Sequence, residues 1–520
     1  MPLTFQHRYL ALVAEIEREF RVREWLCGDA DLWPLARMDL FLDMHWRHTG
    51  QVAQPLPPLA RRAAALLATP FTNAWKSRND LKRWTMRPTP ADAVVLGDDV
   101  SLDLVDGAWQ DRFAEPVIAE LERRGRSTFV MQPGDLGRLP WRRKTYAANL
   151  VDAWSRLAGR ARTDPTELPD LEAVHAYLAR EGIKAPSLAR AALERRARVT
   201  LVAADAFERI LKTVRPRLAF VTTFYAGLAP AFLLACRRLG ILSIDLQHCP
   251  QDGGHKAYGW SNVPAEGYGL LPAVFWNWNQ ADADNINRWA SALPQPWHQA
   301  IHGGDTQLAG FSGQSAHWQQ RFREVAGSAG YAREIIVALQ PIAGQAPIWD
   351  LLAQAIERAP SDWRWWIRRH PSSPPHQDPA FGRLLSLRRD NVLIEQASTL
   401  PLPVLLPHMS TLVSLMSGAA AEAAMFGVPA LFLSEEARGP FGGLIERGCA
   451  RVIDPRQINA EIEALADARP GRSPIAQPSL SETLDRLEEI AADYAALNPA
   501  RRNPEPRKGN RSQRPGLAPG

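Results

Sequence analysis

Residues 411–433 read TLVSLMSGAAAEAAMFGVPALFL, and their pattern is the clearest guide to the fold. An apolar run ends at a Ser-Gly pair, an alanine-rich run follows, and Gly427 separates it from a second apolar run. This order predicts a strand, a helix that starts at once and ends at the glycine, and a second strand. The stretch therefore predicts one strand–helix–strand unit of a parallel sheet.

The same rhythm continues on both sides of this unit. Upstream, EIIVALQ at 334–340 and WRWWIRR at 363–369 predict strands, with a helix at 349–359 between them. Downstream, ARVID at 450–454 predicts a last strand. Five or six such units over residues 321–475 predict a Rossmann-like domain.

An earlier region alternates in the same way. Strands are predicted at 92–99, 218–224 and 241–248, and helices at 113–125 and 228–240. Residues 91–320 therefore predict a second Rossmann-like domain. Helical spacing of apolar residues predicts a helical segment over 1–90 and a final amphipathic helix over 476–497, for which Ser481 is the expected N-cap.

The net charge of +5 comes from the end of the chain. Residues 501–520 carry six basic side chains and one acidic one, so the rest of the chain is neutral. A neutral body argues against a protein that binds nucleic acid along its phosphates. Residues 498–520 have no apolar pattern, which predicts a disordered basic tail. Such a tail can contact an anionic membrane surface.

Cysteine usage and the first residues indicate the compartment. The four cysteines are far apart and have no CxxC spacing, as expected in a reducing environment without disulfides or structural zinc. Acidic residues interrupt the apolar pattern at the N-terminus, which argues against a signal peptide. We expect a cytoplasmic protein, with peripheral contact at the inner face of the membrane through the tail.

The ends of parallel strands are where ligands bind, and four of the predicted strand ends carry polar residues. At 417–422, small residues at a helix start can leave backbone N–H groups facing an anion. Glu422 stands among alanines, where packing does not need a carboxylate, and it can accept hydrogen bonds from a ribose diol. The alternative is a solvated surface glutamate.

At the second strand end, Arg368, Arg369 and His370 follow an apolar run. Two guanidiniums and an imidazole can neutralise a diphosphate. Because the two arginines alternate across the strand, we expect only one of them to face the ligand. The alternative pairs one arginine with a nearby acid and leaves the other in solvent.

These two stretches resemble the donor-binding half of GT-B glycosyltransferases from about residue 335 to 454. The small serine loop, the Glu-Ala pair and FGVP before a strand carry the resemblance, and the HP loop resembles that of capsule-type transferases. The resemblance implies two facing Rossmann-like domains. It also implies donor contacts from Ser417, Gly418 and Glu422, without a resident metal or cofactor.

The third strand end, IDLQHCPQDGGHKAYGW at 244–260, resembles the QHG loop of the acceptor half of these transferases. Cys249 stands where that loop usually has glycine. His248 is the candidate general base or phosphate contact. A histidine that bonds backbone at the strand end is the alternative. The resemblance adds these acceptor-side residues: Gln247, His255, Tyr258 and Trp260.

A further carboxylate could take the proton from the acceptor hydroxyl. Asp98 and Asp99 end the first strand of the acceptor half, and we assign this second catalytic candidacy to Asp99. Loop acids also serve as caps or turn formers, which is the alternative. The sequence has neither HExxH nor a clustered Cys/His set, so no metal site is expected.

Together these patterns predict a glycosyltransferase that moves a sugar from a nucleotide-sugar donor to a surface-polysaccharide or lipid-linked glycan acceptor. Two alternatives stay open on the same scaffold. One is a glycerophospho- or pyruvyl-type transferase, and the other is a non-catalytic relative that acts as a scaffold in glycan assembly. Fold analogy alone does not choose between them.

Overall fold

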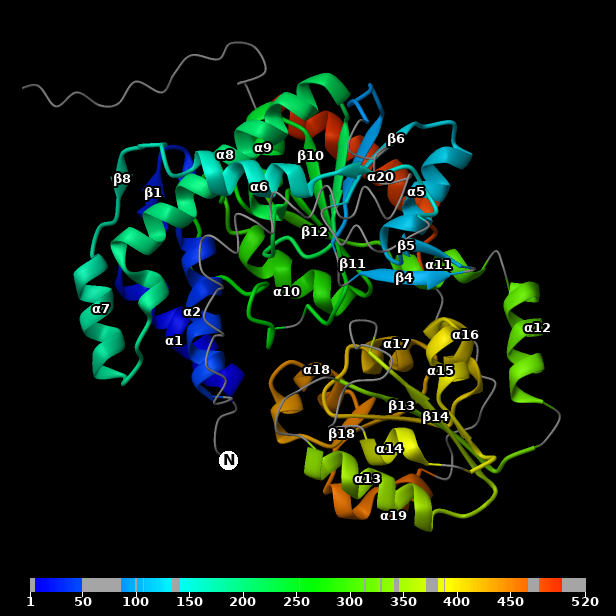
Figure 1. Ribbon diagram of the computed structural model, residues 1–520. Coiled ribbons are helices and arrows are strands. Elements are labelled where there is room, and N and C mark those ends of the chain that lie inside the picture. The colour runs from blue at the N-terminus through cyan, green and yellow to red at the C-terminus, as the bar shows by residue number, and fades with distance from the viewer. Residues whose placement is uncertain are drawn as a thin grey trace, which may run out of the picture.

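The computed structural model describes residues 5–48, 86–98, 101–105, 107–132, 141–251, 253–312, 315–327, 330–340, 346–370, 382–387, 389–465 and 477–497. The tail expected at 498–520 lies outside the described residues. Two α/β domains are stacked one above the other, with the N-terminal helices beside the upper one (Figure 1).

The first domain is built on a parallel sheet of seven strands in the order β12-β11-β10-β9-β3-β6-β7. Numbered along the chain, this order is 3-2-1-4-5-6-7, which extends the Rossmann order by one strand. The strands are β3 (Ala93–Leu96), β6 (Thr128–Gln132), β7 (Tyr146–Ala147), β9 (Leu218–Val221), β10 (Leu242–Leu246), β11 (Val274–Asn277) and β12 (Gln299–His302).

Helices cover both faces of this sheet, because side chains along each parallel strand are buried alternately on either side. Val94 of β3 faces one core with α8, α9 and α10, and Val95 faces another core with α5. The helices are α5 (Ala114–Arg123), α6 (Asn149–Ala158), α7 (Leu171–Arg180), η2 (Pro186–Leu188), α8 (Arg190–Val214), α9 (Ala229–Leu239), α10 (Gln280–Ala290) and α11 (Thr306–Ser312).

The second domain has six parallel strands in the order β15-β14-β13-β16-β17-β18, which is the Rossmann order 3-2-1-4-5-6. The two Rossmann-like sheets predicted from the sequence are therefore confirmed. The strands are β13 (Arg333–Ala338), β14 (Trp363–Arg368), β15 (Val392–Leu393), β16 (Thr411–Ser414), β17 (Ala430–Phe432) and β18 (Ala450–Val452).

Helices also cover both faces of the second sheet. Ile335 and Val337 pack with α13 and α19, whereas Ile336 packs with α16 and α17. The helices are α13 (Ala346–Arg358), α14 (Gly382–Ser386), α15 (Glu395–Thr399), α16 (Leu402–Leu405), η4 (Leu406–His408), α17 (Ala419–Met425), η5 (Glu435–Arg438), α18 (Gly442–Glu446), η6 (Pro455–Gln457) and α19 (Ile458–Glu463).

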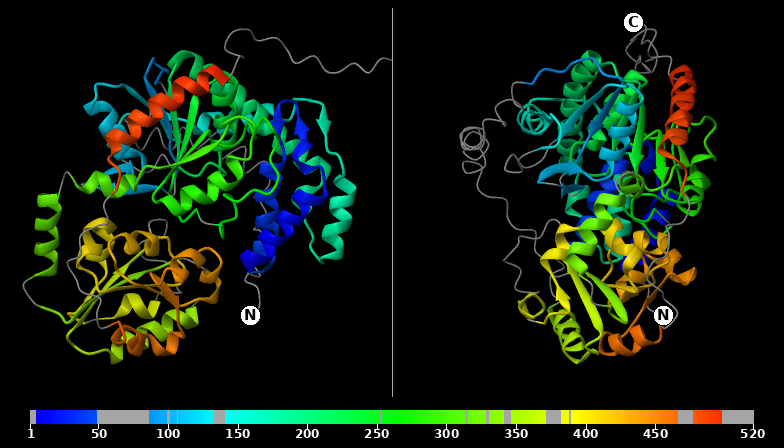
Figure 2. Two further views of the ribbon diagram at one scale, coloured as in Figure 1. Left: turned by 180° about the vertical axis from the view of Figure 1, so that it is seen from behind. Right: turned by 90° about the vertical axis from the view of Figure 1, so that its right-hand side faces the viewer.

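The chain crosses between the domains twice. Helix α12 (Ser315–Ala326) leads into the second domain, and its Trp318 and Phe322 belong to an apolar core that contains residues of both domains. Helix α20 (Leu480–Leu497) returns and crosses the sheet of the first domain (Figure 2). The first domain is thus made of two separate stretches of sequence.

The N-cap residue of α20 differs from the one predicted. Ser479, and not Ser481, caps the helix, because its Oγ accepts from the Glu482 N–H while Glu482 accepts from the Ser479 N–H. This reciprocal pair is a capping box. Ser481 has another partner. Arg124, the residue after α5, donates to the carbonyl of Ser481 and to the carboxylate of Asp485, and these bonds hold the helix on the first domain.

Over its described residues, 5–48 and 86–90, the N-terminal segment is only partly helical; the part of the helical prediction over 49–85 lies outside the described residues. Helices α1 (Phe5–Glu19) and α2 (Trp33–His48) flank η1 (Val22–Glu24), β1 (Leu26–Cys27) and β2 (Ala30–Asp31). Strand β1 also pairs with β8 (Thr166–Glu167). The segment shares one core with α8 and α9, so it is built into the first domain. Strands this short leave no periodic signal in the sequence.

A buried ion pair fixes the face of the second sheet that looks toward α12. Arg364 Nε lies 2.8 Å from Glu334 Oε2, and the Trp366 indole N–H donates to the same oxygen at 2.8 Å. Arg364 also donates to the carbonyl of Ala326, the last residue of α12.

Among the described helices, none is both long and apolar enough to cross a bilayer.

We expect Glu334→Ala to destabilise the protein by about 3–5 kcal/mol, because it leaves the Arg364 charge buried without its partner. Glu357→Ala is the matched control, since Glu357 and Arg383 form a half-exposed pair 2.7 Å apart. Its expected cost is about 1 kcal/mol or less. Urea unfolding followed by circular dichroism measures both. Equal midpoints for the two variants would show that the buried pair does not hold the domain.

Candidate functional site

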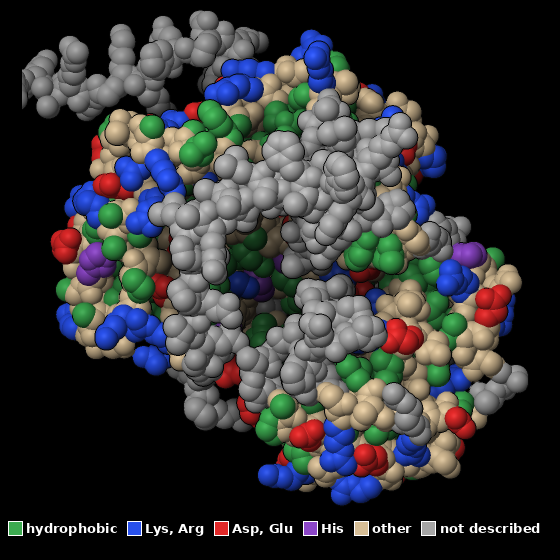
Figure 3. Space-filling view, in the orientation of Figure 1, with side chains coloured by type: hydrophobic (Ala, Val, Ile, Leu, Met, Phe, Trp, Pro, Cys, Tyr) green, Lys and Arg blue, Asp and Glu red, His purple; other side chains and the backbone are tan. Residues whose placement is uncertain are grey.

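The candidate site lies between the two domains, where the space-filling view shows a hollow (Figure 3). In each sheet the strand order reverses between two adjacent strands, β3 and β9 in the first and β13 and β16 in the second. Ligands bind at the carboxyl ends of strands at such a switch point. Residues after these four strands are therefore the first to consider.

In the first domain, Asp98 and Thr223 close the switch point. Thr223 Oγ1 donates to Asp98 Oδ2 at 2.7 Å, and Asp98 Oδ1 accepts from the Ser101 N–H at 2.7 Å. Both oxygens of Asp98 are thus used in holding the loop, as expected of a turn-forming acid. Asp99, the predicted catalytic carboxylate, lies outside the described residues.

The fully buried carboxylate of Asp245, one residue before the end of β10, organises the acceptor-side loop. It accepts from the Phe224 N–H at 3.2 Å and from the Tyr258 hydroxyl at 3.2 Å. Burial raises the pKa of Asp245 to about 8, with smaller contributions from these hydrogen bonds in the opposite direction. Tyr258 is likewise fully buried, so it supports the loop and does not face the hollow.

Gln247 has a similar supporting role. Its side-chain carbonyl accepts from the Trp278 N–H at 2.7 Å, and its amide donates to the Cys249 carbonyl at 2.9 Å and to Asp282 at 2.5 Å. Only 1% of Gln247 is exposed. The predicted acceptor-side residue therefore joins the ends of β10 and β11.

His248 lies beside Tyr225 and Cys249. Its Nε2 is 3.3 Å from the Tyr225 hydroxyl and 3.4 Å from the Cys249 sulfur, and its buried Nδ1 has no hydrogen-bond partner. Burial lowers the pKa of His248 to about 4, although the charge of Asp98 opposes this effect. The ring is therefore neutral at physiological pH, the state in which imidazole can accept a proton.

His255 and Trp260 come from the same loop, but only His255 lies beside Cys249. His255 is buried, its Nδ1 accepts from the Ala257 N–H at 3.2 Å, and its Nε2 lies 3.6 Å from the sulfur of Cys249. Trp260 is in the core under the guanidinium of Arg37, 4.2 Å from the ring centre. The structure brings His255 to the site and places Trp260 outside it.

The start of α17 corrects one expectation. The N–H groups that were to face an anion are mostly bonded locally, because Ser417 N donates to Ser414 Oγ and Ala419 N donates to Ser417 Oγ. The N–H groups of Ala420 and Ala421 also bond within this turn. Short polar side chains capped the helix more readily than an external anion would.

Around that turn, Gly418 leaves room for a ligand. A Cβ built on it would meet nothing within 4 Å, so the position faces open space. The turn itself is fixed by Gln340 after β13, whose side-chain oxygen accepts from the Met416 N–H at 2.8 Å. The second switch point is thus closed by a side-chain amide, with Ser417 and Gly418 on its rim.

Glu422 is the carboxylate that α17 buries, with 8% of its surface exposed. Its Oε2 is buried and has no hydrogen-bond partner. Burial raises its pKa to about 8, the charge of Asp305 adds to the rise, and Arg112 and Arg368 oppose it. The solvated-surface alternative is therefore wrong. At neutral pH, the group is a carboxylic acid that can both donate and accept.

The two arginines at the end of β14 have different partners. Arg369 pairs with the exposed carboxylate of Glu395, and its N–H donates to Ser398. Arg368 donates to the carbonyls of Ala397 and Leu400, and burial together with the nearby positive charge of Arg112 lowers its pKa.

His370 lies in the same electrostatic field as Arg368. Burial lowers its pKa, and the charges of Arg112 and Arg368 lower it further. Arg368 and His370 therefore both lie within the field of a positive charge from the first domain.

The arginine opposite them, Arg112, was not among the sequence candidates. It follows the hairpin of β4 (Leu102–Val105) and β5 (Ala108–Asp111) in the first domain. Its field acts on His248 in its own domain and on Arg368, His370 and Glu422 across the hollow. Arg112 Nε is buried without a hydrogen-bond partner. The site thus contains a cation whose Nε–H can still donate a hydrogen bond.

The sequence did hold a signal for this hairpin. An Asp-Gly pair at 106–107 separates two runs of alternating polarity, LDLV and AWQD, and such a pair is the strongest short hairpin signal. The hairpin also lines a cavity of about 420 Å3 with α5 and α11, to which Asp103 and Arg112 contribute. This cavity opens beside the cluster of charges and provides space for a ligand.

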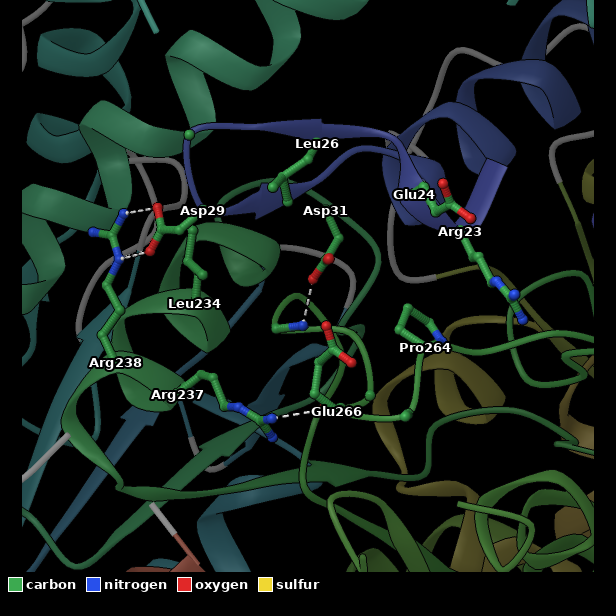
Figure 4. Close-up of a pocket in the computed structure, with 14 residues that line it drawn as sticks. Arg23, Glu24, Leu26, Asp29, Asp31, Leu234, Arg237, Arg238, Pro264 and Glu266 are labelled. Atoms are coloured by element: carbon green, nitrogen blue, oxygen red, sulfur yellow. Dashed lines mark hydrogen bonds and ion pairs between the residues drawn. The ribbon is translucent and has the colours of Figure 1, made fainter. Parts of the chain in front are cut away.

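A larger cavity, of about 880 Å3, lies elsewhere in the first domain. It is lined by β1–β2, the end of α9 and the loop before β11, so it sits at the amino ends of the strands, away from the hollow. Charged side chains that line it already have partners in the protein: Arg238 pairs with Asp29, and Asp31 accepts a hydrogen bond from the Gly269 N–H (Figure 4). It is not part of the candidate site.

Within the described residues, no three His, Cys, Asp or Glu side chains are placed to hold a metal ion. The groups that meet at the site come from both domains. On the second domain these are Arg368, His370 and Glu422. On the first they are His248 and Arg112, with Asp305 near Glu422.

Comparison with known proteins does not identify a function, so the functional assignment rests on the site. No protein-family model matches the sequence, and no curated protein matches it. Among solved structures, UDP-GlcNAc 2-epimerase from Neisseria meningitidis is 14% identical, with a TM-score of 0.47 over 76% of this chain and 99% of that chain. The glycosyltransferase SnogD from Streptomyces nogalater is 12% identical, with a TM-score of 0.38 over 77% and 100%.

The UDP-GlcNAc 2-epimerase from Methanocaldococcus jannaschii is similar to the same extent, at 10% identity and a TM-score of 0.46 over 76% of this chain and 99% of that chain. The two-domain architecture described above follows from the strand order of this chain and does not depend on these likenesses.

The buried carboxylic acid of Glu422 makes stability depend on pH. Its pKa is raised from 4.5 to about 8 on folding, so the folded protein keeps a proton that the unfolded chain releases. Stability should fall as pH rises from about 5 to about 8. Glu422→Gln removes this loss, and its melting temperature relative to the parent should increase between pH 6 and pH 9, by the equivalent of roughly 3 kcal/mol. Glu446→Gln, an exposed position in the same domain, is the control. A constant difference across this range would rule out a buried acid.

Proposed function

We propose that this protein is a glycosyltransferase that moves a sugar from a nucleotide-sugar donor to a glycan acceptor of the surface-polysaccharide or lipid-linked class. The observation that carries the proposal is the cluster between the domains. Arg112 of the first domain acts electrostatically on Arg368, His370 and the buried acid of Glu422 in the second, at the carboxyl ends of two Rossmann-like sheets.

Two guanidiniums and an imidazole suit a diphosphate. Arg368 is held by two backbone carbonyls, so its position is fixed before a ligand arrives, and Arg112 brings an unpartnered Nε from the other domain. A nucleoside diphosphate leaving group carries the charge that develops as the glycosidic bond breaks. Fixed cations in a site sheltered from water stabilise that charge without reorganisation.

Glu422 supplies the nucleoside contact in this proposal. A neutral carboxylic acid can donate one hydrogen bond and accept others, which matches the two hydroxyls of a ribose. It is adjacent to the turn of Ser417 and Gly418, where a Cβ would meet nothing within 4 Å. The nucleoside would lie on the second domain and the diphosphate would extend toward Arg112.

His248 is the proposed base. Its imidazole is neutral at physiological pH and its Nδ1 has no protein partner, so it can take the proton from an acceptor hydroxyl as that oxygen attacks the sugar. The Tyr225 hydroxyl, 3.3 Å from Nε2, holds the ring in place. The acceptor would reach His248 from the cavity beside the β4–β5 hairpin.

The cation cluster recognises an activated phosphate and not the group attached to it. A glycerophospho- or pyruvyl-type transferase is therefore the second candidate, since such donors can present the same phosphate charge. A donor screen separates the two, because only a nucleotide-sugar transferase should release a nucleoside diphosphate from a sugar donor. A protein that binds no activated donor would instead be a scaffold.

Arg112 provides the first test of the binding mode. We expect Arg112→Gln and Arg368→Gln to weaken binding of nucleoside diphosphates roughly tenfold or more, because each loses a charge-assisted hydrogen bond. Affinity for the matching nucleoside should change little. Arg369→Gln is the matched control, since that arginine pairs with Glu395. Calorimetry with UDP, GDP, CDP and dTDP measures the effect. Equal losses in all three variants would place the phosphate elsewhere.

His248→Ala tests the base. We expect it to lower kcat roughly 10²-fold or more while nucleotide affinity and melting temperature stay near those of the parent, because the imidazole acts on the acceptor and not on the donor. Product formation with the donor identified by the screen measures kcat. A stable His248→Ala protein with unchanged kcat would contradict the assignment.

A further inference from the structure

The sulfur of Cys249 is surrounded by nitrogen-bearing side chains of its own loop. His248 Nε2 lies 3.4 Å from it, and His255 Nε2 lies 3.6 Å from it on another side. Lys256 Nζ is 3.4 Å from the same His255 nitrogen. Such surroundings favour a thiolate over a thiol, because a sulfur anion gains from N–H donors and from a nearby ammonium.

The proton on His255 is fixed by a backbone contact. Its Nδ1 accepts from the Ala257 N–H at 3.2 Å, so in the neutral ring the proton is on Nε2, which faces the sulfur as a donor. Burial lowers the pKa of His255 well below its usual value, so the ring is neutral and this arrangement holds at physiological pH.

Lys256 adds the opposite charge. Burial lowers the pKa of Lys256, but the charge of Cys249 raises it in the opposite sense. A thiolate at Cys249 and the ammonium of Lys256 would therefore stabilise each other within this loop.

A second observation concerns His248. Its Nδ1 is buried without a hydrogen-bond partner, although its Nε2 touches both the Tyr225 hydroxyl and the Cys249 sulfur. The nitrogen that faces the sulfur is thus shared with Tyr225, and the other ring nitrogen has no hydrogen-bonding protein group beside it.

The other three cysteines lack these surroundings. Cys27 and Cys236 are buried, and burial raises the pKa of both thiols. Cys449 is half-buried like Cys249, but its recorded contact is the Arg447 carbonyl at 3.9 Å, which gives a thiolate no support. The chain thus contains its own comparison, two half-buried cysteines with opposite neighbours.

We propose that Cys249 is a reactive thiolate and a modification site that electrophiles and peroxides attack in preference to the other cysteines. With an alkylating agent such as iodoacetamide, the sulfur forms a bond to carbon and iodide leaves. With hydrogen peroxide, the sulfur forms a bond to one oxygen while the O–O bond breaks. The leaving hydroxide takes up a proton, and Cys249 becomes a sulfenic acid.

Modification has a consequence for the proposed function and rests on it. Because the sulfur is 3.4 Å from His248 Nε2, any group added to it occupies the space beside the proposed base. A modified Cys249 should therefore block the acceptor side, while nucleotide binding on the second domain continues. The thiol would make transfer sensitive to oxidants and electrophiles.

The test compares the labelling rates of Cys249 and Cys449 in the folded protein. Iodoacetamide is added at pH 7, samples are taken over time, and each cysteine is quantified by peptide mass spectrometry. We expect Cys249 to react roughly tenfold faster than Cys449, the ratio that a largely ionised thiol would give over an ordinary one. In urea, where the loop is unfolded, the two rates should become similar.

Two variants make the result specific. Lys256→Gln should slow labelling of Cys249 and leave Cys449 unchanged, whereas Cys249→Ser should remove the fast-reacting site. Cys249 reacting no faster than Cys449 in the folded parent would overturn the proposal, and so would a Lys256→Gln protein with unchanged rates. Selective labelling with full transferase activity would keep the modification site but remove its link to the proposed role of His248.

Discussion

Every feature of the site depends on one constraint, which is that all strands of both large sheets are parallel and both sheets reverse their strand order near the middle. A parallel strand presents its carboxyl end to the same edge as its neighbours, and the reversal leaves an opening between the helices on either side. Asp98 and Thr223 fill one opening, and Gln340 with the Met416 backbone fills the other. Loops far apart in the sequence therefore meet between the domains.

Burial of ionisable groups is the second theme, and it works in opposite directions for acids and bases. Asp245 and Glu422 are kept as neutral acids near pH 7, whereas His248 and His370 are kept as neutral bases, because each loses water on folding. The guanidiniums stay charged under the same conditions. The result is a site in which two guanidiniums, with the carboxylate of Asp103 nearby, stand among groups that can exchange protons.

Much of the remaining structure serves to hold the loop from 248 to 262. Glu17 of α1, buried with Arg37 of α2 at 3.0 Å, accepts from the Ser261 N–H at 2.8 Å. From the other side, α20 rests against the turn of Gly303, where a Cβ would come within 2.4 Å of the Trp276 indole. Helices α1, α2 and α20, which carry no candidate site residue, thus support the loop that contains His248, Cys249 and His255.

The sequence by itself determined the two Rossmann-like sheets, because apolar periodicity and glycine stops act over a few residues and are visible locally. It also found the strand ends that carry His248, Arg368, His370 and Glu422, since the polar residues follow directly after apolar runs. It did not find Arg112, whose importance comes from facing another domain, nor the supporting roles of Gln247, Tyr258 and Trp260. Which of the two neighbouring arginines pairs with Glu395 was settled by a contact between segments distant in the chain, whereas serines of the same turn bond the N–H groups at the start of α17. Only the tertiary structure sets burial, and burial is what fixes the charge of each group.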